Sequence, residues 1–382
     1  MNVQVRPHLT TAKRSLPFEC VALVLQGGGA LGAYQGGVYE ALAEAHIHPD
    51  WIAGISIGAI NAAIIAGNAP ESRVDRLREF WTQATSSALW HWASLGDQTR
   101  DFLNQMNANF ALACGASFFS ARPVTPWLQP GGTLEATSFY DTKALKQTLE
   151  RLVDFDRLNA GMTRFSAGAV NVRTGNLVYF DNTTHTIGPE HVMASGALPP
   201  GFPAIEIEGE QYWDGGLVSN TPLQWIGETV PRRDTLAFQV DLWSARGDFP
   251  RNMLDVATRE KEIRYSSRTR AGTDQFKHVQ RLRHNLADLI EKLPEDLKNS
   301  PEARLLGKEA EQKVYNVIQL IYRTKNYEGN SKDYEFSRLS MQEHWRAGYH
   351  DARRTLRHRE VLERPTNHQG VFIFDLDRDG RE

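Results

Sequence analysis

Cysteine is scarce in this chain, and so are the long apolar runs that a membrane-spanning helix needs. The 382 residues include two cysteines, Cys20 and Cys114, which excludes the disulfide framework of small secreted domains. We expect two reduced thiols, with a single disulfide as the alternative. The most apolar stretch, residues 52–66, is interrupted by Ser56 and Asn61 and is too short to cross a bilayer. Residues 1–19 contain no apolar segment typical of a signal peptide, so we expect an N-terminal extension and a cytoplasmic protein.

An excess of charge of one sign is also missing. The chain has 43 Lys plus Arg against 46 Asp plus Glu, and 41% of its residues are hydrophobic. This balance supplies enough apolar material for a large core and gives no overall basic surface for nucleic acid. We therefore expect no nucleic-acid partner, and the sequence makes no prediction of oligomeric state.

Two glycine-rich motifs lie near the N-terminus, each between an apolar run and a helical pattern. The first, Gly-Gly-Gly-Ala-Leu-Gly at 27–32, follows the apolar run 21–25 and predicts a strand, a turn and a helix. The second, Gly-Ile-Ser-Ile-Gly at 54–58, opens the small-residue stretch 59–66. This pattern is typical of a nucleophile elbow, whose sharp turn needs flanking glycines because a Cβ would collide there. Ser56 is therefore the candidate nucleophile, and Gly54 and Gly58 flank it.

A serine nucleophile needs a base to take its proton and N–H donors for the oxyanion that forms when it attacks an ester. Consecutive glycines at the start of a helix can present such donors, because no side chain blocks them and the helix dipole favours negative charge. We expect the oxyanion site at Gly27, Gly28 and Gly29, with Gly32 closing the motif. The amides of Gly28 and Gly29 are the foremost candidates.

The order of these motifs, followed by Asp-Gly-Gly at 214–216, resembles the patatin-like phospholipases over about residues 20–245. The segments 194–203 and 212–222 are also similar to that family's approach to its catalytic aspartate. The resemblance implies a Ser-Asp dyad without histidine, here Ser56 and Asp214, with Gly215 and Gly216 completing the motif. It further implies a lipid acyl hydrolase that forms an acyl-enzyme intermediate and needs neither cofactor nor metal.

One position departs from the family's pattern. Leu31 stands where the glycine motif usually has Lys or Arg, which removes a positive charge near the oxyanion site. Ester hydrolysis is thus a firmer expectation than preference for an anionic phospholipid headgroup. Two alternatives stay open: a carboxylesterase acting on a neutral lipid or storage polyester, and a membrane- or partner-binding protein with a vestigial hydrolase domain.

The alternation of strands and helices predicts an α/β fold, a layered sheet flanked by helices with the site at the carboxyl ends of the strands. The hydrolase domain spans 20–245 and contains an expected hairpin of strands 165–171 and 177–181 and a buried strand at 236–240. Residues 86–138 lose clear periodicity and form either an apolar lid or an irregular subdomain core. The aromatic residues behind both interpretations are Trp90, Trp92, Phe118, Phe119 and Trp127.

Residues 246–382 are expected to form a mainly helical C-terminal region. Its segment 251–360 is basic, with 23 Lys plus Arg against 17 Asp plus Glu. In it, Val314, Val317, Ile318 and Ile321 have the spacing of an apolar stripe on a helix. Two interpretations are open: a helical surface for peripheral contact with an anionic membrane or a partner, or a structural element whose stripe joins the core.

Three further patterns suggest other chemistry. The first glycine motif is also typical of a dinucleotide loop, but Asp50 precedes its strand, whereas a ribose-binding acid follows one. His185 and His191 lie near Asp214 in sequence and keep a Ser-Asp-His triad open as an alternative. Residues 375–380 imitate the start of a calcium loop, but its terminal Glu would fall beyond residue 382, so no metal site is expected.

Overall fold

The computed structural model describes residues 16–85, 104, 106–108, 115–325, 328–329, 331–365 and 370–375. A nine-stranded mixed sheet has the order β12-β11-β10-β1-β2-β6-β9-β8, and β7 pairs with β6 outside this path. The strands from β12 to β6 are parallel, whereas β7 and β9 run antiparallel to β6 and β8 runs antiparallel to β9. The strands are β1 (Cys20–Leu25), β2 (Trp51–Ile55), β6 (Arg164–Asn171), β7 (Leu177–Asp181), β8 (Ile205–Ile207), β9 (Glu210–Asp214), β10 (Thr235–Asp241), β11 (Tyr315–Ile321) and β12 (Val371–Phe374). A small separate sheet contains β3 (Gly115–Ala116), β4 (Phe119–Ala121) and β5 (Tyr140–Asp141).

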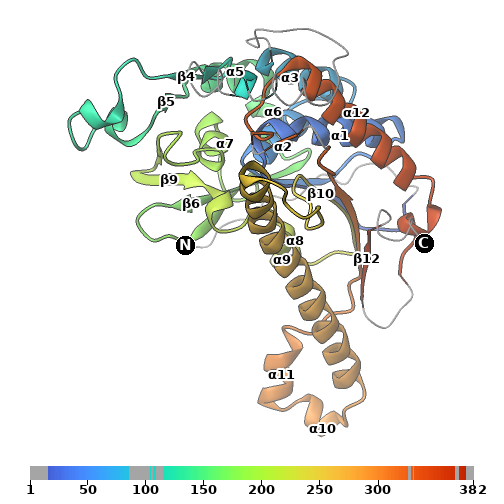
Figure 1. Ribbon diagram of the computed structural model, residues 1–382. Coiled ribbons are helices and arrows are strands. Elements are labelled where there is room, and N and C mark those ends of the chain that lie inside the picture. The colour runs from blue at the N-terminus through green and yellow to red at the C-terminus, as the bar shows by residue number, and fades with distance from the viewer. Residues whose placement is uncertain are drawn as a thin grey trace.

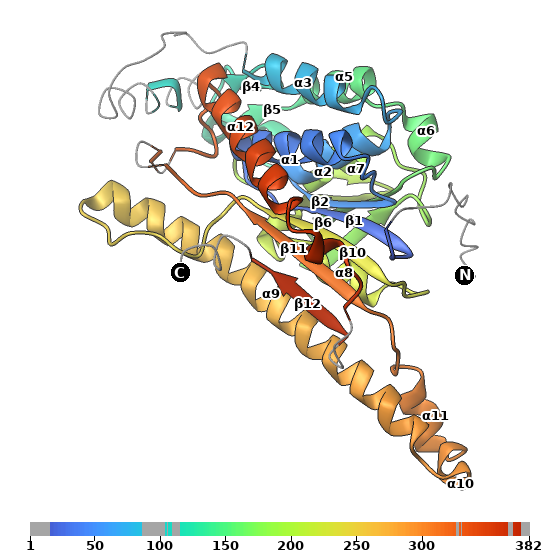
Figure 2. The ribbon, with the colours of Figure 1, turned by 90° about the vertical axis from the view of Figure 1, so that its right-hand side faces the viewer.

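Helices cover both faces of the large sheet (Figure 1). Figure 2 shows α1, α2, α3, α7 and α12 on one face and α8 and α9 on the other. The helices are α1 (Ala33–Glu44), α2 (Ile57–Ala66), α3 (Arg73–Ala84), α5 (Lys143–Leu152), α6 (Phe155–Asn159), α7 (Pro189–Ser195), α8 (Leu223–Glu228), α9 (Met253–Glu291), α10 (Glu295–Lys298), α11 (Pro301–Gly307) and α12 (Arg338–Thr355). Short 3₁₀ helices are η1 (Gly29–Gly32), η2 (Pro126–Leu128), η3 (Leu134–Thr137), η4 (Gly215–Leu217) and η5 (Arg359–Leu362).

The core has a large part and a small part, one on each face of the sheet. The larger cluster packs Tyr34, Trp81 and Phe165 under the helices of the first face, all of them fully buried. The smaller cluster joins Phe276 of α9 and Ile226 of α8 to side chains of the central strands. The predicted α/β fold, a layered sheet flanked by helices with helices in the C-terminal region, is confirmed.

The apolar stripe at 314–321 was expected on a helix, and this prediction is wrong. Residues Tyr315–Ile321 form β11, which lies between β10 and β12 in parallel register. Because the strand is covered on both faces, apolar residues occur on both of its sides, and such a run also matches the spacing of a helical stripe. Val314, Val317 and Ile318 are buried, as expected for the structural interpretation of this stripe.

Helix α12 lies directly against α1, although about 300 residues separate them. Two glycines allow this close approach: a Cβ on Gly37 would overlap the carbonyl of Trp345, and one on Gly348 would overlap the carbonyl of Tyr34. The C-terminal region therefore contributes two strands, β11 and β12, to the sheet. It also contributes α12 to the helices that cover one face of the sheet. The division into domains at residue 245 stays a prediction.

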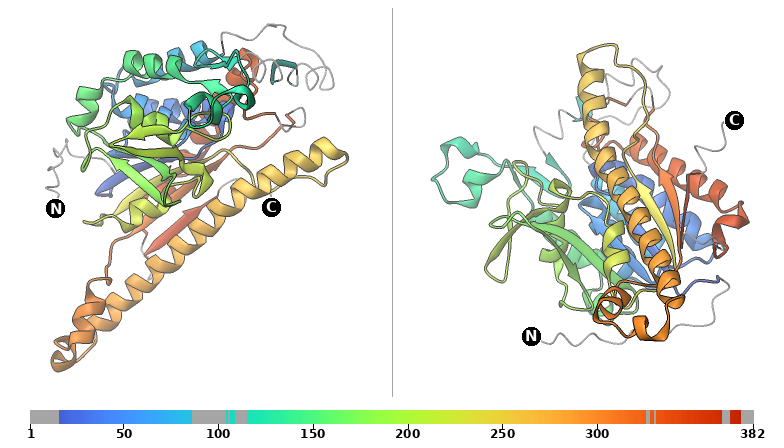
Figure 3. Two further views of the ribbon diagram at one scale, coloured as in Figure 1. Left: turned by 90° about the vertical axis from the view of Figure 1, so that its left-hand side faces the viewer. Right: turned by 90° about the horizontal axis from the view of Figure 1, so that it is seen from below.

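Helix α9, with 39 residues, is the longest helix that the structure describes. It crosses one face of the sheet and continues past the sheet to α10 and α11 (Figure 3). Among the helices that the structure describes, none combines the length and apolar character needed to span a bilayer. The same described residues contain no cluster of three His, Cys, Asp or Glu side chains suited to hold a metal ion.

Candidate functional site

Ser56 lies in a tight turn between β2 and α2. Its backbone has φ 56° and ψ −126°, a conformation that costs a non-glycine residue energy and that is concentrated at functional sites. A Cβ on Gly54 would overlap the carbonyl of Gly58, and a Cβ on Gly58 would overlap the carbonyl of Leu25. Both flanking glycines are thus required sterically, because this turn from strand to helix is sharp.

Asp214 is the last residue of β9 and lies beside Ser56. Its carboxylate accepts a hydrogen bond from the Gly216 amide at 2.7 Å, and the Ser56 side chain lies close enough to stabilise the charged form of the carboxylate. Asp214 is 2% exposed, and this burial raises its pKa to about 6, although the interactions with Ser56 and the Gly216 amide oppose the shift. A carboxyl with this pKa can accept a proton near neutral pH and release it again.

The first glycine motif forms the turn from β1 into η1. Gly29 has φ 56°, and a Cβ there would overlap the carbonyl of Asp333. Among the described residues, no backbone carbonyl accepts a hydrogen bond from the amides of Gly28 or Gly29. Both glycines line the same cavity as Ser56, at the N-terminal end of η1 and α1. These amides are therefore suitably placed to bind a negatively charged oxygen.

Ser56, Asp214 and the glycine turn share one cavity of about 230 Å³. Its remaining wall is mainly apolar and aromatic, and the aromatic residues come from several separate segments: Phe118, Phe119, Tyr140, Phe202, Trp243, Tyr265, Tyr334 and Phe336. Among the described residues that line it, Asp214 and Asp333 are the acids, and none is Lys or Arg. Such a cavity suits an acyl chain better than a charged group.

The segment 86–138 is partly described. Phe118 and Phe119 pack edge to face with each other and with Phe336, and all three line the cavity. Trp127 is 85% exposed, whereas Trp90 and Trp92 lie outside the described residues. Part of this segment is thus a wall of the cavity, and the choice between lid and subdomain core stays open.

Three supporting side chains were missed by the sequence analysis. Ser195 accepts a hydrogen bond from the Ser56 amide at 3.0 Å and donates to the carbonyl of Gly168 at 2.6 Å. Asn220 and Trp243 each donate to the carbonyl of Gly27 at 3.0 Å. Ser195 and Asn220 belong to the segments 194–203 and 212–222, but no local pattern distinguishes them there.

The structure also places several residues behind the alternative interpretations, namely a histidine triad, a dinucleotide loop and a calcium loop. His185 and His191 both pack against Phe180, and among the described residues no histidine lines the cavity. Asp50 accepts a hydrogen bond from the Val21 amide at 2.8 Å, a structural contact between β1 and the start of β2. Residues 376–380 of the calcium-like pattern lie outside the described residues, as does Cys114.

Comparison with known proteins shows which protein family this chain matches. A model described as Patatin-like phospholipase matches residues 23–224, and a second, described as Patatin phospholipase, matches residues 263–368. The chain is 40% identical over 74 residues to Patatin-like phospholipase domain-containing protein 7 of Rattus norvegicus. It is 38% identical over 76 residues to Patatin-like phospholipase domain-containing protein 6 of Homo sapiens. These matches cover 19% and 20% of this chain but 6% of either relative's length.

Two solved structures are similar at low identity. VipD from Legionella pneumophila is 14% identical with a TM-score of 0.42, over 95% of this chain and 73% of that one. The type III effector protein ExoU is 14% identical with a TM-score of 0.33, over 91% of this chain and 54% of that one.

Proposed function

The chain belongs to the patatin-like phospholipase family, and from this premise we propose that it is a lipid acyl hydrolase that cleaves carboxylic esters through Ser56 and Asp214. The observation that carries the proposal is that the strained Ser56 and the buried Asp214 line one apolar cavity and that their side chains interact there. Family membership alone leaves the catalytic residues open.

In the first half of the proposed reaction, Asp214 takes the proton of the Ser56 hydroxyl while Ser56 Oγ attacks the ester carbonyl carbon. The carbonyl oxygen becomes an oxyanion, which the amides of Gly28 and Gly29 stabilise. When the tetrahedral intermediate collapses, the bond to the alcohol breaks and protonated Asp214 returns its proton to the leaving oxygen. The acyl group then remains on Ser56.

Hydrolysis of the acyl-enzyme repeats these steps with water. Asp214 takes a proton from the water as its oxygen attacks the acyl carbon, and the same amides hold the second oxyanion. Collapse releases the fatty acid and returns the proton to Ser56. No step requires histidine, a metal ion or a cofactor.

The charges of the cavity wall bear on the alcohol part of the ester. Leu31 is fully buried, and no described residue lining the cavity is cationic. A phosphate group inside the cavity would therefore find no Lys or Arg among the described residues that line it. This observation favours the second candidate function, a carboxylesterase acting on an ester without a phosphate group.

The proposal is tested by labelling and by a substrate panel. We expect a fluorophosphonate probe to label the protein on Ser56, located by peptide mapping, and we expect no labelling of Ser56→Ala. A diacyl phospholipid, a lysophospholipid, a neutral lipid and a short soluble ester then report the preferred alcohol. A folded protein that resists the probe and hydrolyses none of the four esters would instead support a vestigial hydrolase domain.

Activity is expected to fall on the acid side of pH 6. Since burial raises the pKa of Asp214 to about 6, above its ordinary value, the carboxyl is mainly protonated below that pH and cannot act as a base. For a soluble uncharged ester, kcat/KM should drop by about tenfold for each pH unit below 6 and level off above it. Samples returned to pH 7 should recover full activity, which separates titration from unfolding. If kcat/KM instead fell only below about pH 4, the base would have an ordinary carboxyl pKa. This result would contradict the assignment of the buried Asp214 as the base.

A further inference from the structure

The carbonyl of Gly27 is held in place by two side chains. It accepts two side-chain hydrogen bonds, from Asn220 Nδ2 and from Trp243 Nε1, both at 3.0 Å. This carbonyl and the amide of Gly28 belong to the same planar peptide unit, in which C=O and N–H point in opposite directions. Fixing the Gly27 oxygen therefore fixes the direction of the Gly28 N–H, which is one of the two proposed oxyanion donors.

The position of Trp243 is itself defined from several sides. Its backbone amide donates to Gln26 Oε1 at 3.1 Å, so Trp243 is tied to the residue that precedes the glycine turn. Its ring stacks on Tyr265 of α9 with a centroid distance of 5.0 Å. A Cβ on Gly28 would lie 3.2 Å from Trp243 Nε1, which shows how closely the indole approaches the turn.

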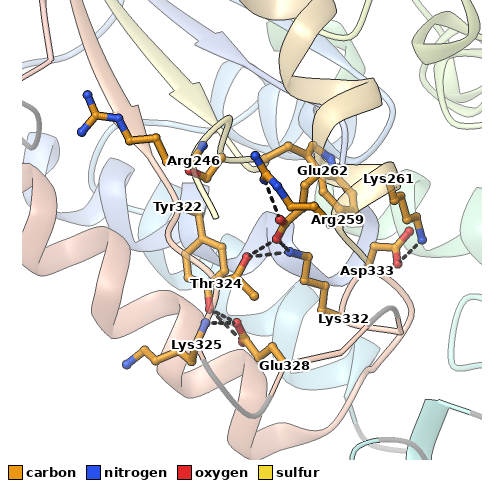
Figure 4. A network of polar contacts seen from close by, with 12 residues as sticks. Arg246, Arg259, Lys261, Glu262, Tyr322, Thr324, Lys325, Glu328, Lys332 and Asp333 are labelled. Atoms are coloured by element: carbon orange, nitrogen blue, oxygen red, sulfur yellow. Dashed lines mark hydrogen bonds and ion pairs between the residues drawn. The ribbon is translucent and has the colours of Figure 1, made fainter. Parts of the chain in front are cut away.

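Two ammonium groups lie over the Trp243 ring, those of Lys332 at 5.1 Å and Lys261 at 5.7 Å from its centroid. Lys332 is buried and pairs with Glu262 at 2.5 Å, and Thr324 and Arg259 bind the same carboxylate (Figure 4). A cation over an indole ring is attractive, and by drawing electron density from the ring it also strengthens the N–H as a donor.

The second lysine connects to the glycine turn by another route. Lys261 pairs with the Asp333 carboxylate at 2.6 Å, as Figure 4 shows. The backbone carbonyl of Asp333 accepts a hydrogen bond from the Ala30 amide at 2.7 Å, one residue after the turn's third glycine. Residues of α9 and of the segment 331–336 are thus connected to the start of the glycine turn through Trp243 and to its end through Asp333.

We infer that Trp243 is a positioning residue of the oxyanion site, and that α9 and the segment 331–336 hold it in place through Tyr265, Lys261 and Lys332. The inference rests on the proposed function, because it assigns Trp243 a role in orienting the Gly28 amide. It also gives the C-terminal region a part in the chemistry, since Tyr265 and both lysines lie beyond residue 245.

Replacing Trp243 by Phe tests this role, because it keeps an aromatic ring and removes the N–H. We expect kcat on a soluble short ester to fall about tenfold with KM unchanged, since the donor orientation matters only once the oxyanion develops. An alkyl trifluoromethyl ketone, which forms an oxyanion on reaction with a serine, should bind about tenfold more weakly to the variant. The matching alkyl methyl ketone should bind equally to both proteins.

Trp225→Phe is the matched control. Trp225 also donates its Nε1–H to a protein group, Ser166 Oγ at 3.2 Å, and stacks on a tyrosine, Tyr179 at 4.5 Å, but it does not line the cavity. Its variant should keep the wild-type kcat and both inhibitor affinities. Equal losses in the two variants, a change in KM alone, or an unaffected Trp243→Phe would overturn the inference.

If Trp243→Phe does not fold, the Lys261→Met variant is used to test the same inference. Removing this cation should lower kcat about threefold at constant KM, whereas Lys313→Met, which breaks a surface pair with Glu19, should have no effect. A Lys261→Met enzyme indistinguishable from Lys313→Met would then overturn the inference. A wild-type protein that hydrolyses no ester would overturn the proposed function as well, and an active wild type with unaffected variants would overturn the inference alone.

Discussion

Ser56→Ala and Asp214→Asn are each expected to lower kcat by about 10³-fold or more, and the double variant should be little worse than either single one. The two side chains act as one unit, because the hydroxyl is a poor nucleophile until the carboxylate accepts its proton. Each substitution removes the interaction between the Ser56 hydroxyl and the Asp214 carboxylate in the apolar cavity. Initial rates on a short soluble ester, with thermal unfolding to establish that each variant is folded, measure the effect.

Asp241→Asn is the matched control for the aspartate. Its carboxyl is also buried, at 3% exposed, and burial raises the pKa of Asp241 to about 7, yet it does not line the cavity. It accepts hydrogen bonds from Gln239 and Thr221, and this variant should remain within a few-fold of wild-type turnover. The dyad would be wrong if folded Asp214→Asn kept wild-type turnover, or if Asp241→Asn lost as much activity as Asp214→Asn.

The elements around Ser56 were predictable because their signals are local. An apolar run, a glycine-flanked serine and a run of small residues define β2, the elbow and α2 within 16 residues, from Trp51 to Ala66. The hairpin of β6 and β7 is equally local, since a short turn joins its two strands. The positions of Ser56 and Asp214 side by side could be inferred only from the resemblance, because 158 positions separate them in the chain.

The C-terminal strand β11 was mistaken for a helix because burial on both faces removes the alternation that identifies a strand. Its β-branched residues Val317, Ile318 and Ile321 were a usable signal, since such side chains favour strands. Residues that favour helices dominate the surrounding sequence, so this short segment was not recognised as a strand. Burial of β11 depends on β10 and β12, which are far from it in sequence, so tertiary structure decides its conformation.

Trp243 could have been found by its position in the sheet. The predicted strand 236–240 corresponds to β10, which pairs with β1 in parallel, so the residues after both strands lie at the same edge. The glycine turn follows β1 and Trp243 follows β10. What the sequence could not supply is the register that brings the indole N–H to the carbonyl of Gly27.

Truncation after residue 245 is expected to abolish folding of the remaining chain. The deletion removes β11, so β10 becomes an edge strand with unpaired backbone groups, and it removes α12 from the glycine-lined face of α1. It also removes large buried side chains, among them Tyr322, Phe276 and Trp345. Each contributes about 1.5–3 kcal/mol by burial, so a handful of them matches the whole stability of a typical domain, about 5–15 kcal/mol.

We therefore expect residues 1–245 to be insoluble, or soluble without a cooperative thermal transition and without esterase activity. Co-expression with residues 246–382 as a separate chain is the control, because the two fragments can rebuild the same sheet and should recover soluble, active protein. The competing interpretation makes the basic segment 251–360 a membrane-facing surface, whose binding to anionic vesicles would weaken with salt. A soluble and fully active 1–245 fragment that had lost only vesicle binding would favour that interpretation. It would also contradict the inferred support of Trp243 by Tyr265, Lys261 and Lys332.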